Sequence, residues 1–393
     1  MKKRILIIAN AYSFLYKFER ENVALLQRMG YEVHYAANLK EQCYEEQKRI
    51  VERLGICLHH LPLARSPYLY RQNKEAFDVL LSLIRCHSIE VLHCHTPVAA
   101  VLARLASRFV KRPLYIIYTA HGFHFYRGAP LLNNTLYYLV ERQLAKETDV
   151  LITINEEDHA QAKKLRLKPG GRVYLIPGVG LDIARFHPLS PITILRQRQS
   201  MGFLSEDFVA VSVGELNGNK NQEALLDVFV KLRTMGACMA HMHCLILGDG
   251  VYEARLRRQI RERALQDSVH LLGHVHDVRM ILGSSDVFLF PSKREGLGMA
   301  ALEALSMGIP VIAADNRGTR EYMQDGENGF VCEPEVLPVQ MAQGILRLQR
   351  MRLLEKERLR QRCMLSVRMY EKRYPRRIMQ EIYTRMDAQV YGS

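Results

Sequence analysis

Short apolar segments rich in β-branched residues alternate along the chain with longer segments whose apolar positions recur at the helical period. This alternation predicts a parallel α/β sheet, because parallel strands need a crossover, usually a helix, between them. In the first half, helices are predicted over Phe18–Met29, where Gly30 ends the pattern, and over Asn73–Arg85. The strands predicted in this half are Arg4–Ala9, Glu32–Ala37, Val91–Cys94, Leu114–Thr119, Val150–Ile154 and Val173–Ile176.

The same alternation starts again in the second half, with helices predicted over Asn221–Met235 and Val251–Leu265. The strands predicted here are Phe208–Val213, His243–Leu247, Val269–Leu271, Val287–Phe290 and Val311–Ala313. A stretch punctuated by Pro and Gly, from Pro177 to Pro188, separates the two series and suits a linker. The expected fold class is α/β, with two Rossmann-like doubly wound domains at residues 1–187 and from residue 188 onward, and a cleft between them.

The charge balance limits the classes of partner that the protein can bind. The 393 residues include 55 Lys and Arg against 41 Asp and Glu, a net charge of +14, and residues 1–187 hold 27 basic and 17 acidic groups. Such a surplus implies an acidic partner, which could be nucleic acid, an anionic lipid surface or a phosphorylated substrate. No helix-turn-helix, RRM or zinc-finger pattern is visible and tryptophan is absent, so no nucleic-acid partner is expected.

The termini and the cysteines indicate a cytoplasmic protein. Apolar runs such as Ile5–Ala11 fall short of the ~20 residues that span a bilayer, and the basic start is better interpreted as a first strand than as a signal peptide. The eight cysteines are scattered singly, as in reduced proteins. No metal is expected at His93-Cys94-His95, because alternate strand residues face opposite ways and no further ligand cluster is evident.

Near the C-terminus, Arg347–Arg377 holds twelve Lys and Arg and three acidic residues on a helical pattern, with a break expected at Tyr374-Pro375. We interpret this stretch as a solvated helix surface in preference to a specific anion-binding face.

The segment Phe290–Asp315 contains the residues that point most clearly to a chemical function. A strand ends at Pro291, a loop with Gly296 and Gly298 follows, and a helix is predicted from about Met299 to Gly308. Glycines let a ligand approach the backbone closely, and the amides at a helix N-terminus favour phosphate. Glu295 lies in the loop and Glu303 eight residues later on a largely apolar helix. In isolation Glu303 could be a buried carboxylate that caps a backbone group, or one that accepts hydrogen bonds from two adjacent sugar hydroxyls; its pairing with Glu295 favours the second interpretation.

These residues resemble a known family. Glu295 and Glu303 form the E-x7-E pattern of retaining GT-B glycosyltransferases of family 4, and Pro291–Glu303 with Asp315–Glu321 look like the capsular and exopolysaccharide branch of that family in bacteria. The likeness runs nearly end to end, through Val211–Asn221, His95–Ala100 and Thr119–Phe125. It implies that residues 188–366 form the donor domain and that residues 367–393 form a helix returning to the first domain.

The resemblance also assigns roles. Glu303 would bind the ribose of the nucleotide, Lys220 would neutralise the diphosphate leaving group, and Glu295 and His121 would be the catalytic contacts to the donor sugar. Taken alone, Lys220 would be a solvated turn lysine and His121 a structural histidine. The donor-binding residues implied are Asn217, Lys220, Arg294, Gly296, Leu297, Gly298, Met299, Glu303, Arg317 and Gly318.

Two departures from the family pattern stand out. Glu215 occupies the position where most members have an arginine, so part of the phosphate clamp must come from elsewhere, with Arg294, Arg317 and Arg320 as candidates, or Glu215 faces away. The first strand is followed by an aromatic segment without glycine, which we expect to shape the acceptor site. The acceptor-side candidates are Asn10, Tyr12, Ser13, Phe14, His95 and His124.

The function expected from the resemblance is transfer of a hexose or N-acetylhexosamine from a nucleotide-sugar, most simply a UDP-sugar, to a saccharide on a polyprenyl diphosphate, for cell-surface polysaccharide. No cofactor or metal is expected, since no D-x-D motif occurs. The enzyme would sit peripherally on the inner face of the bacterial plasma membrane, with Ala99–Arg112 as one candidate contact or an ordinary packed helix. The alternatives are a GT-B sugar-nucleotide epimerase and a non-catalytic anion-binding protein.

Overall fold

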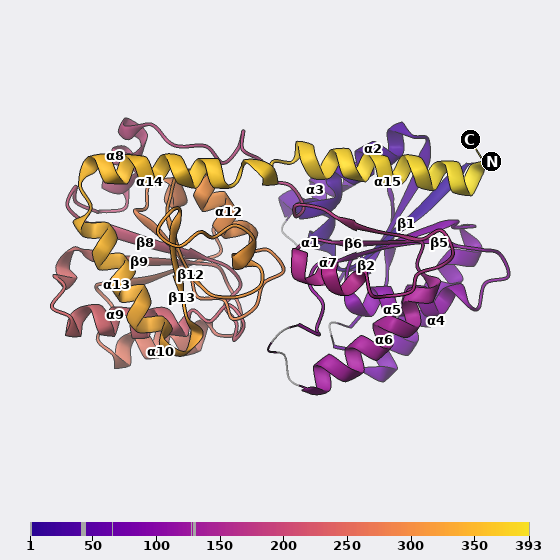
Figure 1. Ribbon diagram of the computed structural model, residues 1–393, viewed down its shortest axis with the longest axis horizontal. Coiled ribbons are helices and arrows are strands. Elements are labelled where there is room, and N and C mark those ends of the chain that lie inside the picture. The colour runs from indigo at the N-terminus through magenta and orange to yellow at the C-terminus, as the bar shows by residue number, and fades with distance from the viewer. Residues whose placement is uncertain (1, 41–44, 65, 127, 129–130, 393) are drawn as a thin grey trace. The chain divides into compact units, whose positions relative to one another are not determined.

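The computed structural model describes residues 2–40, 45–64, 66–126, 128 and 131–392 of the chain (Figure 1). It contains two compact units, which we call unit 1 (Met1–Val179 with Arg373–Ser393) and unit 2 (Gly180–Lys372). The division falls at residue 179 and not at 187, because Leu181 already belongs to unit 2. Its amide donates to the Tyr370 carbonyl over 2.7 Å, and its carbonyl accepts from the Lys372 amide over 3.0 Å. For the same reason the last segment of unit 1 begins at Arg373 and not at residue 367.

Unit 1 is built on a seven-stranded parallel sheet with the order β3-β2-β1-β4-β5-β6-β7. Its strands are β1 (Lys3–Ala11), β2 (Tyr31–Asn38), β3 (Cys57–His60), β4 (Val91–Cys94), β5 (Tyr115–Ala120), β6 (Val150–Thr153) and β7 (Arg172–Leu175). Strand β3 was not predicted, because its sequence Cys-Leu-His-His has no apolar alternation. It is an edge strand, and only its pairing with β2 makes it a strand.

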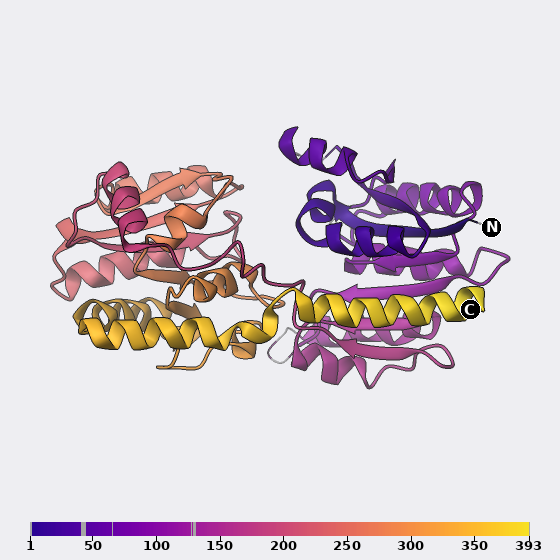
Figure 2. The ribbon, with the colours of Figure 1, turned by 90° about the horizontal axis from the view of Figure 1, so that it is seen from above.

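The helices of unit 1 cover both faces of this sheet. They are α1 (Tyr12–Phe14), the π-helical turn η1 (Leu15–Glu19), α2 (Arg20–Arg28), α3 (Glu45–Glu52), α4 (Tyr70–Cys86), α5 (Pro97–Ser107), the π-helical turn η2 (Asn133–Tyr137), α6 (Tyr138–Leu144), the short η3 (Ala145–Glu147), α7 (Glu156–Ala162) and α15 (Arg373–Tyr391). Helical structure therefore starts at Tyr12 and not at Phe18, directly after β1. Figure 2 shows α15 running along unit 1, where Tyr383 and Met386 are buried.

Unit 2 is built on a six-stranded parallel sheet with the order β10-β9-β8-β11-β12-β13. Its strands are β8 (Phe208–Val213), β9 (Met242–Leu247), β10 (Val269–Gly273), β11 (Val287–Phe290), β12 (Val311–Ala314) and β13 (Gly329–Cys332). Its helices are α8 (Pro191–Ser200), α9 (Glu223–Thr234), η4 (Met239–His241), α10 (Glu253–Glu262), α11 (Arg279–Gly283), α12 (Met299–Ser306), η5 (Thr319–Glu321), η6 (Pro334–Val336), α13 (Leu337–Arg350), α14 (Leu353–Ser366) and η7 (Arg368–Tyr370).

The basic C-terminal stretch is broken in places other than the one predicted. The helices α13 and α14 are separated at Met351 and Arg352, and α15 starts at Arg373 after η7. Pro375 lies in the first turn of α15, where its missing N–H costs no helical hydrogen bond. Four arginines of α13 and α14 line a hollow of about 660 Å³ together with Glu355, so this surface is concave as well as basic.

No residue of helix α5 is exposed, so its arginine, Arg104, is an internal residue and not part of a charged surface. Arg104 is only 1 % exposed, and its guanidinium forms two hydrogen bonds with Glu141 of α6, over 2.7 and 3.0 Å. The helix ends at Ser107, and Arg112 donates to the carbonyls of Ile84 and Ile89. Of the two interpretations of Ala99–Arg112, a membrane contact or an ordinary packed helix, the structure supports the second for Arg104, which holds two helices together inside the unit.

The strand order of each unit determines where a ligand can bind. Both sheets follow the order 3-2-1-4-5-6 of dinucleotide-binding Rossmann sheets, which reverses direction between the first and fourth strands. Ligands bind beyond the carboxyl ends of the strands at this switch point. In unit 2 it lies between β8 and β11, and in unit 1 between β1 and β4. Within the described residues, no helix is both long enough and apolar enough to cross a membrane.

Candidate functional site

At the carboxyl end of β8 the chain makes a turn that fixes Lys220. The side-chain oxygen of Asn217 accepts hydrogen bonds from the amides of Asn219 and Lys220, over 3.0 and 2.9 Å. This is the local side-chain-to-backbone bonding that makes asparagine a turn residue. The turn is also held to the next loop, since the Asn219 side chain donates to the Arg294 carbonyl over 2.9 Å. Asn217 thus positions Lys220, and the family resemblance implies that both belong to the same site.

The loop after β11 brings Glu295 to this lysine. The Lys220 ammonium lies 2.6 Å from the Glu295 carboxylate and 5.5 Å from the centre of the Phe290 ring. Lys220 and Glu295 are 75 positions apart in sequence and meet because β8 and β11 are neighbours in the sheet. The pair presents a cation and a hydrogen-bond acceptor side by side, a combination suited to an anionic group next to a polyol.

Two glycines allow this loop to pack. Gly298 has a φ of +92°, and a Cβ there would lie 2.7 Å from the Phe290 ring. A Cβ on Gly318 would lie 2.8 Å from the Cβ of Glu295. Neither position can hold a larger side chain without moving the loop. The first amides of α12, from Met299, have no acceptor within the helix and are available to an anion.

Glu303 lies one turn inside α12 and is half-buried. Its carboxylate has neither a hydrogen bond nor an ion pair with any residue that the structure describes. Burial raises the pKa of Glu303 to about 7, and the nearby charge of Arg185 only partly opposes this. The backbone-capping interpretation is therefore not the one observed, and Glu303 is an unpaired acceptor.

Tyr322 is a residue of this site that the sequence did not reveal. Its hydroxyl is buried without a hydrogen-bond partner among the described residues, and a Cβ on Gly298 would come within 3.0 Å of it. Burial and the charge of Glu295 raise the pKa of Tyr322 well above 10, so the hydroxyl stays protonated and can donate. The neighbouring residues, Glu321 and Met323, form no motif with Tyr322 that would indicate this role.

The remaining donor-side candidates take different positions. Arg317 is buried and donates to the Glu295 carbonyl over 3.3 Å, and Leu297 is buried in the loop. Arg320 forms a bidentate pair with Asp315, over 2.7 and 2.8 Å, and is largely committed to it. Glu215 has an exposed side chain, and its carbonyl accepts from Gln222 over 3.0 Å.

In unit 1 a histidine cluster occupies the corresponding switch point. His95 contacts His121 over 3.4 Å and the Glu19 carboxylate over 3.4 Å, while Phe14 packs on both histidine rings. Burial lowers the pKa of His121 to about 4, so its imidazole is neutral at pH 7. Burial raises the pKa of Glu19 to about 8, so the Glu19 carboxyl is protonated there.

Two residues of the trio His93-Cys94-His95 belong to a group of potential metal ligands. His93 and His95 lie on the same face of β4, with ring centres 4.1 Å apart, and Glu19 joins them to form a group of potential ligands. The statement that no further ligand cluster is present is therefore wrong. Both nitrogens of His93 are already in hydrogen bonds, however, with Tyr383 and Thr119, each over 2.9 Å.

The other acceptor-side candidates are only partly brought together. Asn10 accepts a hydrogen bond from Thr96 over 2.6 Å, which places it beside His95. Tyr12 and Ser13 lie in the turn of α1 that leads to Phe14. His124 packs instead against Tyr137, with ring centres 5.1 Å apart. Glu19 was missed because a glutamate early in an amphipathic helix is normally solvated, and only the π-helical turn η1 directs it inward.

The chain matches two protein-family models and several known glycosyltransferases. Residues 20–183 match the model of "Glycosyltransferase Family 4" and residues 194–364 that of "Glycosyl transferases group 1". The chain is 39% identical over 335 residues to EpsD of Bacillus subtilis (strain 168), which bears the name of a glycosyltransferase, covering 85% of this chain and 84% of that protein. The chain belongs to the family 4 glycosyltransferases. A further relative, at 29% identity over 69% of each chain, is the Escherichia coli UDP-Gal:alpha-D-GlcNAc-diphosphoundecaprenol alpha-1,3-galactosyltransferase.

Solved structures give the same fold. HepE of Anabaena, determined in complex with UDP and glucose, superposes on this glycosyltransferase with a TM-score of 0.75 at 18% identity, covering 98% of this chain and 99% of HepE. Sucrose-phosphate synthase of Thermosynechococcus elongatus superposes with a TM-score of 0.77 at 16% identity, covering 98% and 100%. The predicted GT-B architecture of two Rossmann-like domains is confirmed for this glycosyltransferase.

Proposed function

We propose that this glycosyltransferase transfers a hexose or N-acetylhexosamine from a UDP-sugar, with retention of anomeric configuration, to a saccharide on a polyprenyl diphosphate. The product would be an intermediate of cell-surface polysaccharide. The observation that carries the proposal is the meeting of Lys220 with Glu295 at the switch point of unit 2, together with the unpaired Glu303 of α12, the helix that follows the Glu295 loop.

The donor part rests on the chemistry of each group. Lys220 and the first amides of α12 supply positive charge for the diphosphate, which is the leaving group and gains charge in the transition state. Glu303 supplies an unpaired acceptor for the ribose hydroxyls, and Glu295 one for the sugar. HepE, which shares the fold, was crystallised with UDP-glucose, and this supports a uridine nucleotide.

His121 is proposed to contact the donor sugar from unit 1. Because its imidazole is neutral and held by His95 and Phe14, it can exchange hydrogen bonds with a hydroxyl without adding charge. None of these residues is proposed as a covalent nucleophile. Attack by the acceptor on the face from which UDP departs accounts for retention, and basic side chains and amides take the place of a bridging metal.

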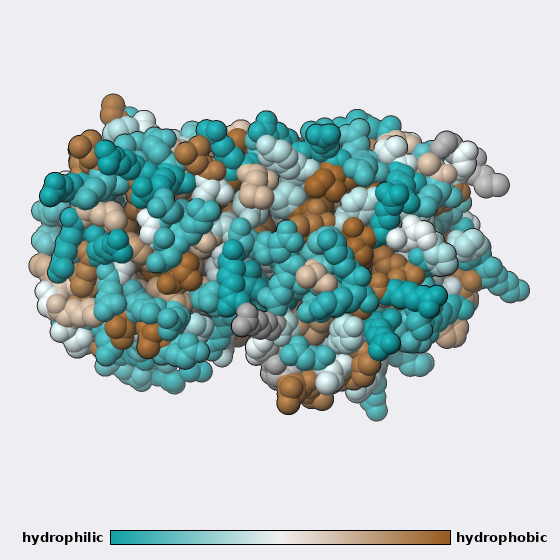
Figure 3. Space-filling model, in the orientation of Figure 1, coloured by the Kyte–Doolittle hydropathy of each residue, from teal (hydrophilic) through white to brown (hydrophobic). Residues whose placement is uncertain are grey.

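The acceptor part rests on the relatives and on the surface of unit 1. The Escherichia coli relative acts on a sugar linked to diphosphoundecaprenol, and WcaL of Escherichia coli (strain K12), 27% identical over 48% of this chain, bears the name of a colanic acid biosynthesis glycosyltransferase. Apolar side chains gather on the lower edge of unit 1, over η2 and the start of α6 (Figure 3). They include Leu131, which is 84% exposed, and Leu132. An exposed apolar patch on a basic unit suits the inner face of the plasma membrane, where we propose the enzyme binds.

UDP is expected to stabilise the enzyme in the presence of EDTA. At a hundred times its Kd, UDP should add about 2.7 kcal/mol to the free energy of unfolding, a shift of several degrees in Tm. The Glu303→Ala variant should lose this shift, whereas Glu262→Ala, an exposed glutamate of α10, should keep it. A UDP shift that survives in Glu303→Ala would contradict the assigned donor site. Once UDP binds, turnover of UDP-sugars without acceptor would favour the epimerase instead.

The unliganded enzyme is expected to gain stability when Glu303 is replaced by Gln. The pKa of Glu303 is about 7 in the folded state and near 4.5 when unfolded, so the folded state holds this proton more tightly. Stability is therefore lost as pH rises from about 4.5 to about 7, and the full penalty persists above it. At pH 8 Glu303→Gln should raise the free energy of unfolding by about 1–3 kcal/mol, with no difference at pH 4. Denaturant titrations at both pH values measure this, and an equal effect at both would refute the assignment.

A further inference from the structure

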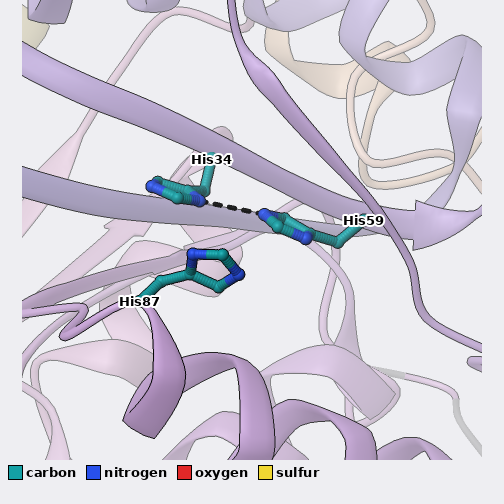
Figure 4. A group of neighbouring side chains, drawn as sticks. All are labelled: His34, His59 and His87. Carbon is teal, nitrogen blue, oxygen red and sulfur yellow. Dashed lines mark hydrogen bonds between the residues drawn. The ribbon is translucent and has the colours of Figure 1, made fainter.

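A second histidine cluster lies at the β3 edge of the unit 1 sheet, away from the switch point. His34 of β2 and His59 of β3 are on the same face of the sheet, because the register pairs His34 with Cys57 and Ala36 with His59. His87, which directly follows α4, covers them (Figure 4). One ring nitrogen of each histidine lies within 4.8 Å of the others.

The three rings are arranged as a compact group. His34 Nδ1 and His59 Nε2 are 2.9 Å apart in a hydrogen bond, and their rings stack with an angle of 7° between planes. The His87 ring centre is 4.9 Å from that of His34 and 4.8 Å from that of His59. Tetrahedral Zn²⁺ with bonds of about 2.0–2.1 Å needs its nitrogen ligands about 3.3–3.4 Å apart. The ring nitrogens of the group lie within 4.8 Å of one another, a range that includes this spacing.

Burial favours the neutral form of two of these imidazoles, His34 and His59. Burial and the neighbouring histidines lower the pKa of His59 to about 4, and burial lowers that of His34 as well. Neutral imidazole is the form that binds metal. Glu32, which is shared with Lys2 and Arg4, lies 3.3 Å from His34 Nε2, and this buried nitrogen has no hydrogen bond among the described residues.

A second group of potential ligands lies on the same face. Cys57, at the exposed start of β3, forms a second close group with His34 and Glu32. The two groups share His34 but are separate, since Cys57 and Glu32 do not belong to the close group of His34, His59 and His87. Zn²⁺ accepts all three kinds of ligand. The group around His93 offers less, since both nitrogens of that histidine are occupied.

We propose that His34, His59 and His87 bind a divalent transition-metal ion of the Zn²⁺ class, with a water molecule as fourth ligand. The ion would tie the edge strand β3 to β2 and to the end of α4, and so stabilise unit 1. This proposal is independent of sugar transfer, because the site lies beside β3, two strands away from β1 in the sheet.

The test is titration of the full chain, stripped of metal by chelation, with ZnCl2 in a calorimeter, together with metal analysis after dialysis. One Zn²⁺ per chain is expected, with an increase in Tm. The double variant His59→Gln/His87→Gln should weaken binding by more than about 100-fold, since even the loss of an outer-shell partner costs about 10–100-fold. The matched control is His243→Gln/His270→Gln, which changes the two-histidine contact of unit 2.

The outcomes separate the proposal from chance binding. Absence of Zn²⁺ binding to the natural chain would overturn it, as would equal binding in the natural chain and the double variant. Loss of binding in the control as well would overturn it too. Should the double variant not fold, the single variant His87→Gln gives the same test, because His87 lies after the last turn of α4 and outside the core.

Discussion

Replacing Lys220 by Ala is expected to lower kcat by about 100- to 1,000-fold, the usual cost of removing one group that stabilises developing negative charge. Lys220 is held by the Asn217 turn beside Glu295, so its ammonium is fixed before the diphosphate departs. The change also leaves Glu295 without its partner in the ion pair. We expect KM for the UDP-sugar to rise less than kcat falls, because the interaction strengthens in the transition state.

The measurement is release of UDP from UDP-sugars, assayed with a polyprenyl-diphosphate-linked acceptor. Lys231→Ala serves as control, since Lys231 is an exposed lysine of the next helix in the same unit. It should leave both kcat and KM unchanged. If Lys220→Ala kept kcat within a few-fold of the natural enzyme, the role of Lys220 at the leaving group would have to be abandoned. Retention is read separately, from the anomeric proton coupling of the product.

Replacing Glu141 by Ala is expected to destabilise unit 1 by about 3–5 kcal/mol, because it leaves the Arg104 guanidinium buried and unpaired. Arg104 is 1% exposed, and its other contacts, the Ala100 carbonyl and the Tyr118 ring, do not neutralise its charge. Denaturant unfolding followed by circular dichroism measures the change. A loss of this size is a large share of the stability of a natural domain.

Two controls test the cause. Glu147→Ala removes an ion pair with Arg108 that is partly exposed to solvent, and should cost at most about 1 kcal/mol. The double variant Arg104→Met/Glu141→Leu removes both charges and should recover most of the stability lost in Glu141→Ala. A double variant as unstable as Glu141→Ala would mean that packing of the side chains, and not the unpaired charge, explains the loss.

Part of the site can be predicted from the amino-acid sequence because its signals are local. The loop with Gly296 and Gly298 depends on backbone freedom, so it appears as a short motif. Asn217 and Lys220 were assigned only through the resemblance to family 4, and the structure shows the turn that joins them. Glu19 and Tyr322 cannot be predicted in this way. Each becomes significant through burial, which depends on the elements packed around it.

The sequence by itself determined the α/β class, the repeated strand and helix pattern, and the glycine loop of the β11–α12 segment, because these follow from periodicity and from conformational preferences of single residues. The roles of Glu295 and Glu303 were assigned through the resemblance to family 4. Only the tertiary structure decided that Arg104 is an internal ion-pair partner, and that His34, His59 and His87 form one group. Strand β3 likewise forms only because it pairs with β2. The physical reason is common to all three: burial, charge compensation and strand pairing arise between segments distant in the chain, and no local pattern encodes them.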